Sequence, residues 1–365
     1  MSLVFAGAAV AQQEPGRITN TIVIKDTPLD AGEQKIVSDT VNYWIKQMAT
    51  GKPEAVAAGR DRLIEPYNQA PKEHFLAYYN QIVATALVTI ADSKHLITRI
   101  NVQIVAKMVK NAKIAEVIKI GLLDTSSAVV YPTAQSAAAL MADPNTPLEL
   151  RLTMVKPLIV ALQKEGSGWV LEYLYQALVD TREIPAIEAV LRKLNDRVFF
   201  HADKINGMMG AEITGIKAVS NRLTRLNFDN IKIPNDVLKL FGQALYRYAD
   251  LCTQVLVENK ASPNHEAAYL SMLNECDLGF DWLISKPLGM APPKRLRGQD
   301  LKLQRLTVLQ DWSALLKKKP LELTDAELAP PKPEAPKAPK APAEVPAVAP
   351  APGVPATVEA PADGK

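Results

Sequence analysis

The chain has 365 residues, of which 48% are hydrophobic, so it is long enough to bury a large core without disulfides or metals. Its formal net charge at pH 7 is only +3, which argues against a protein dedicated to binding nucleic acid. Its two cysteines are too few for a disulfide framework.

Residues 1–11 are apolar and end in Ala9-Val10-Ala11, the small-x-small pattern of a signal-peptide cleavage site. We expect them to be the remnant of a secretory signal, and the protein to be exported to the periplasm or cell envelope. The basic residues that open a complete signal are absent, so a chance apolar terminus is the alternative. Residues 12–29 are expected to be extended, with a β-like run at 21–24.

From residue 30 onward, periodic apolar residues alternate with Gly, Pro, Asn and Asp turn signals, which predicts helices joined by short turns. Asp30 and Glu33 have the spacing of a capping box at the start of the first helix. Such short turns force neighbouring helices to lie antiparallel. We therefore expect an all-α fold, with regular repeats over 30–195 and a helical continuation over 196–290. Helices are predicted over 31–49, 53–69, 72–92, 95–110, 112–123, 127–142, 147–164, 168–180, 184–195, 208–226, 235–258, 264–285 and 300–318.

The stretch GLLDTSSAVVYPTAQSAAALMA, residues 121–142, combines a Leu-Leu-Asp helix end, a Ser/Thr turn, a Val-Val entry and an alanine-rich face. Alanines at helical spacing allow helices to approach closely, and the turn from Asp124 to Ser127 is expected to cap the next helix. This stretch resembles a HEAT-type repeat, although Val130 and Tyr131 stand where an arginine is usual. The resemblance extends over about a third of the chain and implies antiparallel helix pairs stacked as a HEAT-like or armadillo-type α-solenoid. It also implies a binding scaffold.

We find no spacing typical of a catalytic triad, a phosphate-binding loop or a zinc module, so we expect no enzyme, no cofactor and no metal. An α/α-toroid enzyme is the alternative, with paired carboxylates among Glu275, Asp277 and Asp281, but a solvated helix face explains these residues more simply. Three glycines predict a loop after residue 196. His201 would lie in it as an ordinary loop histidine near a solvated Asp203, the alternative being two ligands of a metal site.

Cys252 and Cys276 lie on adjacent predicted helices. Two interpretations remain open for them. Free cysteines are often buried and inert, whereas an exported chain could join them in a disulfide. Their spacing to His265 between them matches no zinc module.

Basic residues gather in 291–319, which is predicted to be a linker followed by an amphipathic helix. They could touch an anionic envelope surface or another polyanion. Alternatively, the lysines simply favour a helix C-terminus through the helix dipole, and the arginines belong to a solvated linker. The candidate polyanion contacts are Lys294, Arg295, Arg297, Lys317, Lys318 and Lys319.

Residues 320–365 are rich in Pro and Ala and are expected to form a disordered tail, because proline cannot continue a helix or a sheet. The tail is either a passive terminus or a spacer carrying P-x-x-P ligands. We expect a protein partner, no transmembrane helix and no nucleic acid. The predicted function is a non-enzymatic binding or scaffolding protein of a bacterial-type cell envelope. An envelope protein anchored through the basic helix and tail is the alternative.

Overall fold

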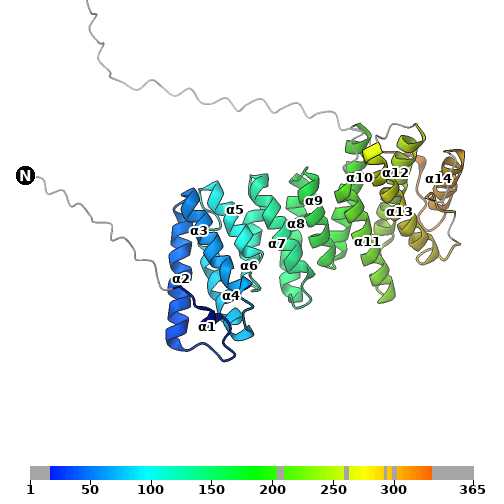
Figure 1. Ribbon diagram of the computed structural model, residues 1–365. Coiled ribbons are helices and arrows are strands. Elements are labelled where there is room, and N and C mark those ends of the chain that lie inside the picture. Colours follow the sequence, from blue (N-terminus) through cyan, green and yellow to red (C-terminus); the bar gives the residue numbers. More distant parts are fainter. Residues whose placement is uncertain (1–16, 204–208, 259–262, 292–293, 298–301, 331–365) are drawn as a thin grey trace, which may run out of the picture. The chain divides into compact units, whose positions relative to one another are not determined.

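The computed structural model describes residues 17–330 except 204–208, 259–262, 292–293 and 298–301. Within these ranges the chain is helical and has no β-strand, which confirms the all-α prediction (Figure 1). Residues 1–11, predicted to be a secretory remnant, and the part of the predicted tail from 331 onward lie outside the described residues. The helices are α1 (Asn20–Val23), α2 (Ala31–Ala49), α3 (Pro53–Ile64), the 3₁₀ turn η1 (Glu65–Asn68), α4 (Glu73–Val88), α5 (Leu96–Ala106), α6 (Ile114–Leu122), α7 (Ser127–Ala142), α8 (Leu148–Lys164), α9 (Gly168–Asp180), α10 (Ile184–Asp203), α11 (Gly210–Phe228), α12 (Asn235–Val257), α13 (Pro263–Ser285), α14 (Lys302–Leu316) and α15 (Asp325–Leu328).

The helices from α2 to α14 alternate between two layers. The odd-numbered layer consists of α3, α5, α7, α9, α11 and α13, and each of these helices packs against the next one in the layer. The even-numbered layer, α2 to α14, is built in the same way. Each odd-numbered helix also packs against the even-numbered helix before it, as α2 with α3 and α12 with α13. The fold is thus a row of stacked helix pairs, compatible with an α-solenoid.

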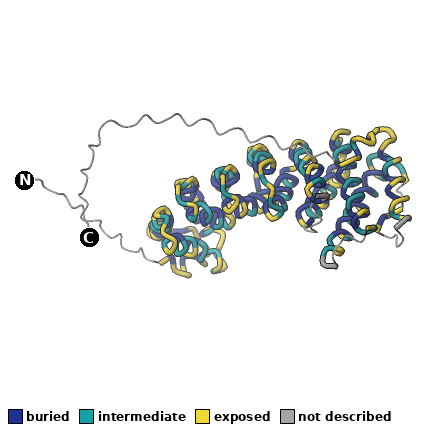
Figure 2. The backbone as a smooth tube through the Cα atoms, turned by 90° about the horizontal axis from the view of Figure 1, so that it is seen from above, coloured by how far each residue is buried: buried dark blue, intermediate teal, exposed yellow. Residues whose placement is uncertain are grey.

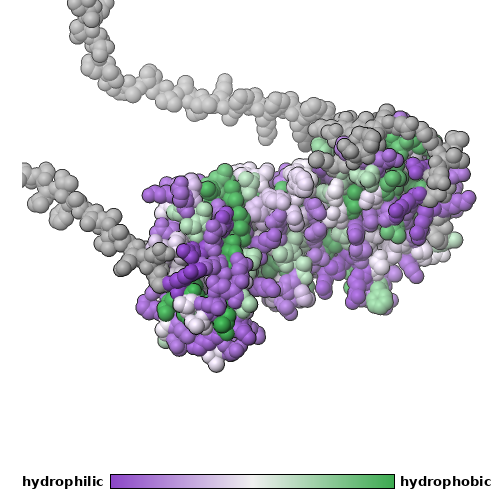
Figure 3. Space-filling view, in the orientation of Figure 1, coloured by the Kyte–Doolittle hydropathy of each residue, from purple (hydrophilic) through white to green (hydrophobic). Residues whose placement is uncertain are grey.

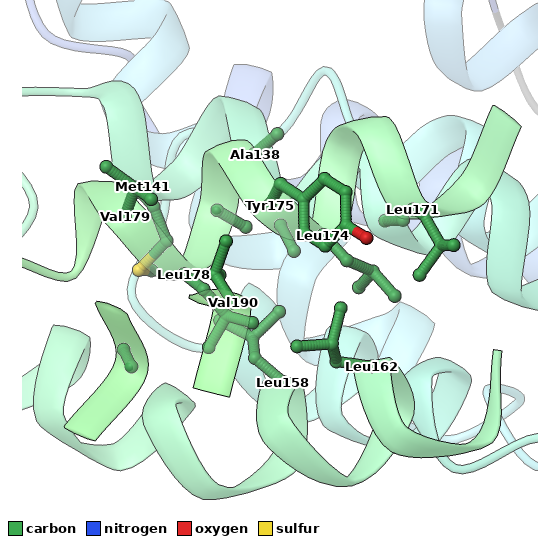
Figure 4. Packing of buried hydrophobic residues seen from close by; sticks show 14 of the residues in the cluster. Ala138, Met141, Leu158, Leu162, Leu171, Leu174, Tyr175, Leu178, Val179 and Val190 are labelled. Carbon is green, nitrogen blue, oxygen red and sulfur yellow. The ribbon is translucent and has the colours of Figure 1, made fainter. Parts of the chain in front are cut away.

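The core is continuous from one pair to the next. Figure 4 shows one section of it, where leucines of α8 and α9 lie together with Met141 of α7, Tyr175 of α9 and Val190 of α10. Figure 2 shows the buried residues between the two layers and the exposed residues on the outer surfaces. Because burying each such side chain contributes about 1.5–3 kcal/mol, the interface between layers supplies most of the stability.

Small residues let α7 approach its neighbours closely. Ala134 and Ala137 have no exposed surface, and Ala138 is also buried. At Gly121 of α6, an added Cβ would lie only 2.4 Å from Oγ1 of Thr133 in α7, so a larger residue there would push the two helices apart. The alanine-rich face read from the sequence is therefore an inter-helix contact.

The first helix follows its sequence signals closely. The Asp30 side chain accepts a hydrogen bond from the backbone N–H of Glu33, and the Glu33 carboxylate accepts one from the N–H of Asp30. This confirms the capping box. Asp124 behaves differently from its predicted role, because Ser126 is the residue that precedes α7 and its side chain makes no capping hydrogen bond. Asp124 instead accepts from Ser126 N at 2.8 Å and from Arg99 Nε at 2.6 Å.

The structure differs most from the prediction in three places, and elsewhere the helix ends shift by up to a few residues. The β-like run at 21–24 is wrong, because α1 is a short helix that buries Ile22 and Val23 together on one side. The loop predicted after residue 196 is wrong up to Asp203, since α10 continues to that residue. The range expected to be disordered from 320 contains α15, which is preceded by a capping box between Thr324 and Glu327. The apolar side chains of Leu321, Leu323 and Leu328 are buried there.

Candidate binding surface

One exposed surface of the odd-numbered layer is apolar over three successive helices, and we call it the apolar face. On α5, residues 96, 100 and 104 recur at helical spacing on the side turned away from the core, and Leu96 is 44% exposed. Its exposed members are Leu96 of α5, Tyr131 of α7 and Trp169 of α9, and its partly exposed members are Ile100, Ile104 and Tyr173. Figure 3 shows hydrophobic surface over the part of the row where α5 lies.

The sequence of α9 explains how its aromatic rings come to be exposed. Leu171, Leu174 and Leu178 recur at helical spacing and are fully buried, which turns the opposite side of the helix outward. Trp169 lies on that outward side and is 68% exposed. Tyr173 follows one turn later and is half-buried.

Neighbouring helices join their exposed rings. The ring of Tyr131 in α7 meets the ring of Tyr173 in α9 edge to face, with centroids 5.9 Å apart. Such an aromatic pair holds both rings in place beyond the effect of burial alone. The apolar face is therefore a continuous surface across α7 and α9 and not a set of isolated side chains.

Charge is sparse on this face. The 16 residues of α7 include no Asp, Glu, Lys, Arg or His. Lys107, just past the end of α5, directs its Nζ toward Oε1 of Gln135 in α7 at 3.3 Å. A contiguous exposed patch with few charges and a polar rim is typical of an interaction site.

The residues predicted to contact a polyanion are mostly engaged within the chain. Arg295 pairs with Asp281 at 2.5 Å, and Lys317 pairs with Asp325 at 2.5 Å. Arg297 donates to the side-chain oxygen of Asn274 at 2.6 Å, and Lys319 lies 4.0 Å from Glu322. Lys294 and Lys318 line one groove together with Asp311. Four of the six cations thus lie near an acidic or amide side chain of the chain itself, and the other two share one groove.

Asp277 is not the solvated residue expected from the sequence. It is 2% exposed, and its carboxylate accepts hydrogen bonds from the backbone N–H groups of Leu296, at 2.8 Å, and Arg297, at 2.9 Å. Burial raises its pKa, and the two backbone hydrogen bonds offset only part of that effect. Asp277 therefore ties the segment after α13 to the helix pair and has a structural role.

Cys252 and Cys276 are free thiols with no exposed surface. Burial raises the pKa of both, and the neighbouring Cys252 raises the pKa of Cys276 further. The disulfide stays a prediction for oxidising conditions. Across the described ranges, no three His, Cys, Asp or Glu side chains are placed to hold a metal ion. None of the described helices is both long enough and apolar enough to cross a membrane.

Sequence reasoning missed a buried ionic cluster of Arg197, His201 and Glu212. Arg197 donates from Nε to Oε1 of Glu212, and from Nη1 to the carbonyl of Gly166 at 2.9 Å. His201 Nε2 lies 3.3 Å from the same carboxylate oxygen. Burial alone would raise the pKa of Glu212, but the interaction with His201 and the charge of Arg197 outweigh it and lower that pKa.

A signal for this cluster was present in the sequence. Arg197 and His201 are four residues apart, which places them on one side of a helix. In a predicted loop, this four-residue spacing does not place the two side chains on one side, so the cluster was not predicted. His201 is in fact in α10 and 5% exposed, so it is not an ordinary loop histidine.

Comparisons with known proteins add no family. No protein-family model matches the sequence. No curated protein matches it significantly.

Proposed function

We propose that this chain is a non-enzymatic binding protein, built as a HEAT-like or armadillo-type solenoid, whose apolar face holds a segment of another protein. The observation that carries the proposal is the apolar face itself: apolar side chains on the outer sides of α5, α7 and α9, with the Tyr131–Tyr173 ring pair joining α7 to α9 and no charged residue on α7. Exposed apolar patches of this kind are typical of protein-binding surfaces.

Trp169 and Tyr131 are the expected anchors of this contact. Large aromatic side chains lose little conformational entropy when bound, and they dominate the energy of many interfaces. Trp169 is 68% exposed and has most of its surface left to bury against a partner. Truncating such an anchor typically weakens binding by about 2 kcal/mol or more.

We also propose that the protein acts outside the cytoplasm, in a bacterial-type cell envelope, from the apolar and small-x-small pattern of residues 1–11. Anchoring through the basic helix and tail is the second candidate. The ion pairs of Arg295 with Asp281 and of Lys317 with Asp325 favour the binding role, because they leave fewer cations for an anionic surface.

Site-specific photo-crosslinking in cells of the source organism tests the binding role. A photoreactive amino acid replaces Tyr131 or Trp169, and the control position is Leu152 of α8, which is 46% exposed in the even-numbered layer. We expect both test positions to crosslink to the same partner and Leu152 to give no such product. Equal products from all three positions, or none from any, would contradict the proposal.

A further inference from the structure

A groove opens between α9 and α11, where α9 ends. Its space is ≈ 280 Å³. We call it the arginine groove. Its walls carry Gln176, Asp180, Ala218, Asn221, Arg222 and Arg225.

Arg222 is the least satisfied cation in the groove. Its side chain is 15% exposed, and its Nη2 lies 3.5 Å from Oδ1 of Asp180, which is too long for a strong ion pair. Its Nε is buried and has no hydrogen-bond partner among the described residues. A guanidinium with one unpaired donor and one long ion pair has hydrogen-bonding capacity left, so its exposed part would bind an incoming acceptor favourably.

Further arginines surround the same carboxylate. Burial lowers the pKa of Arg222, and the nearby charge of Arg182 lowers it further. Arg182 follows α9 with φ of 70°, a conformation uncommon outside glycine, and its charge acts on both Asp180 and Arg222. Arg225 lines the groove and pairs with Asp229 at 3.2 Å.

Arg151 does not compete for a ligand, because its guanidinium is already satisfied. It donates to the backbone carbonyls of Met141, Thr146, Asp143 and Asp180. Its positive charge nevertheless acts on both Asp180 and Arg222. Asp180 is therefore one carboxylate among several guanidinium groups.

We propose that the arginine groove binds a carboxylate side chain of the segment that the apolar face holds, so that the partner is an acidic peptide with aromatic or aliphatic residues. This inference rests on the proposed function. Asp180 offsets part of the positive charge, which suits a singly charged carboxylate better than a doubly charged phosphate.

The two surfaces lie along one side of α9. Trp169 lies near one end of that side and Asp180 at the other. The helix between them spans about 16 Å at a rise of 1.5 Å per residue. An extended peptide covers this length in about five residues. The partner motif is therefore an apolar residue and an Asp or Glu separated by about five positions.

Selection from a phage-displayed library of random dodecapeptides on the full chain tests both proposals. We expect selected peptides to carry an Asp or Glu about five positions from an aromatic or aliphatic residue. Failure to select any peptide would overturn both the binding role and this inference. Peptides that bind without a recurring acidic residue would overturn this inference alone.

The strongest selected peptide is then measured by fluorescence anisotropy, together with its counterpart in which the acidic residue is replaced by the amide. Arg222→Gln is expected to weaken binding of the acidic peptide on the order of tenfold and to leave the amide peptide unchanged. Arg192→Gln is the matched control, because Arg192 is exposed on α10 in the even-numbered layer and pairs with Glu188. Circular dichroism verifies that each variant is folded.

Two results would contradict the acidic-peptide assignment at this step. The first is equal weakening of both peptides by Arg222→Gln, which would mean that Arg222 shapes the groove without contacting the acid. The second is tighter binding of a fluorescent single-stranded oligonucleotide than of the peptide, with loss of that binding in Arg222→Gln, which would assign the groove to nucleic acid.

Discussion

At the scale of single residues, the buried cluster of Arg197, His201 and Glu212 departs most from an ordinary solenoid core. Arg197 and Glu212 come from consecutive helices, α10 and α11, so their contact joins the two layers through charge. A buried ion pair contributes little net stability when intact, but removing one partner leaves the other charge unpaired in an apolar surrounding.

Glu212→Gln is therefore expected to lower the free energy of unfolding by about 3 kcal/mol, because the amide keeps the shape but leaves Arg197 without its counter-charge. Urea titration measures the change. Glu188→Gln is the matched control, since Glu188 forms a partly exposed pair with Arg192 and should lose less than about 0.5 kcal/mol. Equal losses in the two variants would show that the cluster is not electrostatically important.

The same carboxylate predicts a pH dependence. Its folded-state pKa lies below the ordinary value of 4.5, so its stabilising contribution is full above pH 4.5 and is lost as the pH falls through the folded-state value. The stability difference between wild type and Glu212→Gln should therefore shrink as the pH falls below 4.5. Urea titrations of both proteins across this range give the comparison, and a difference that stays constant into acid would refute the assignment.

At the scale of helices, α7 shows how closely local sequence signals can predict the two ends of a helix. Its observed bounds, Ser127–Ala142, match the predicted range, because a Ser/Thr turn and an Asp-Pro-Asn break enclose it. α10 was predicted to end too early. Its last turns bury Val198 in the core and His201 beside Glu212 of α11, and that tertiary packing outweighed the glycine signals that follow.

Ala137→Leu is expected to lower the free energy of unfolding by about 1–3 kcal/mol, since the larger side chain must displace helices that already touch this buried alanine. Ala139→Leu is the control on the same helix, because Ala139 is exposed and should change the stability by less than about 0.5 kcal/mol. Thermal unfolding followed by circular dichroism compares the two. If Ala139→Leu proved the more destabilising change, the orientation of α7 would be wrong.

The apolar face also belongs to the scale of helices, and it was only partly readable. Tyr131 and Trp169 are evident as aromatic residues, but periodicity places an aromatic residue on the core side or the outer side only when the rest of the helix is known. Their meeting across α7 and α9 needs the stacking of pairs, which no local pattern contains. The arginine groove was missed for the same reason, since its residues come from the ends of separate helices.

At the scale of the whole described body, the main contacts of each helix are with its partner and with the nearest helices of the two layers. Stability in such an array is close to a sum of local terms, and damage at one place need not reach the other end. The stacked pairs could be predicted because short turns allow few alternatives. The length of the row, and which side chains meet on its surface, could not be predicted from the sequence.

Trp312→Ala tests this locality. Trp312 of α14 stacks on Phe280 of α13 with ring centroids 3.9 Å apart, and its removal should destabilise the C-terminal helices by about 3–5 kcal/mol. Hydrogen exchange followed by mass spectrometry should show lost protection in α12, α13 and α14, with α2 to α6 unchanged. A uniform loss along the chain would mean that the array unfolds as one cooperative unit.

The two buried cysteines make local opening of the protein measurable by thiol alkylation. A thiol reacts with alkylating reagents as its thiolate, and both Cys252 and Cys276 are enclosed and held in the protonated form by burial. Their modification in a native sample must wait for α12 and α13 to part. The alkylation rate therefore reports how readily this helix pair opens spontaneously, and the native cysteines serve as the probe.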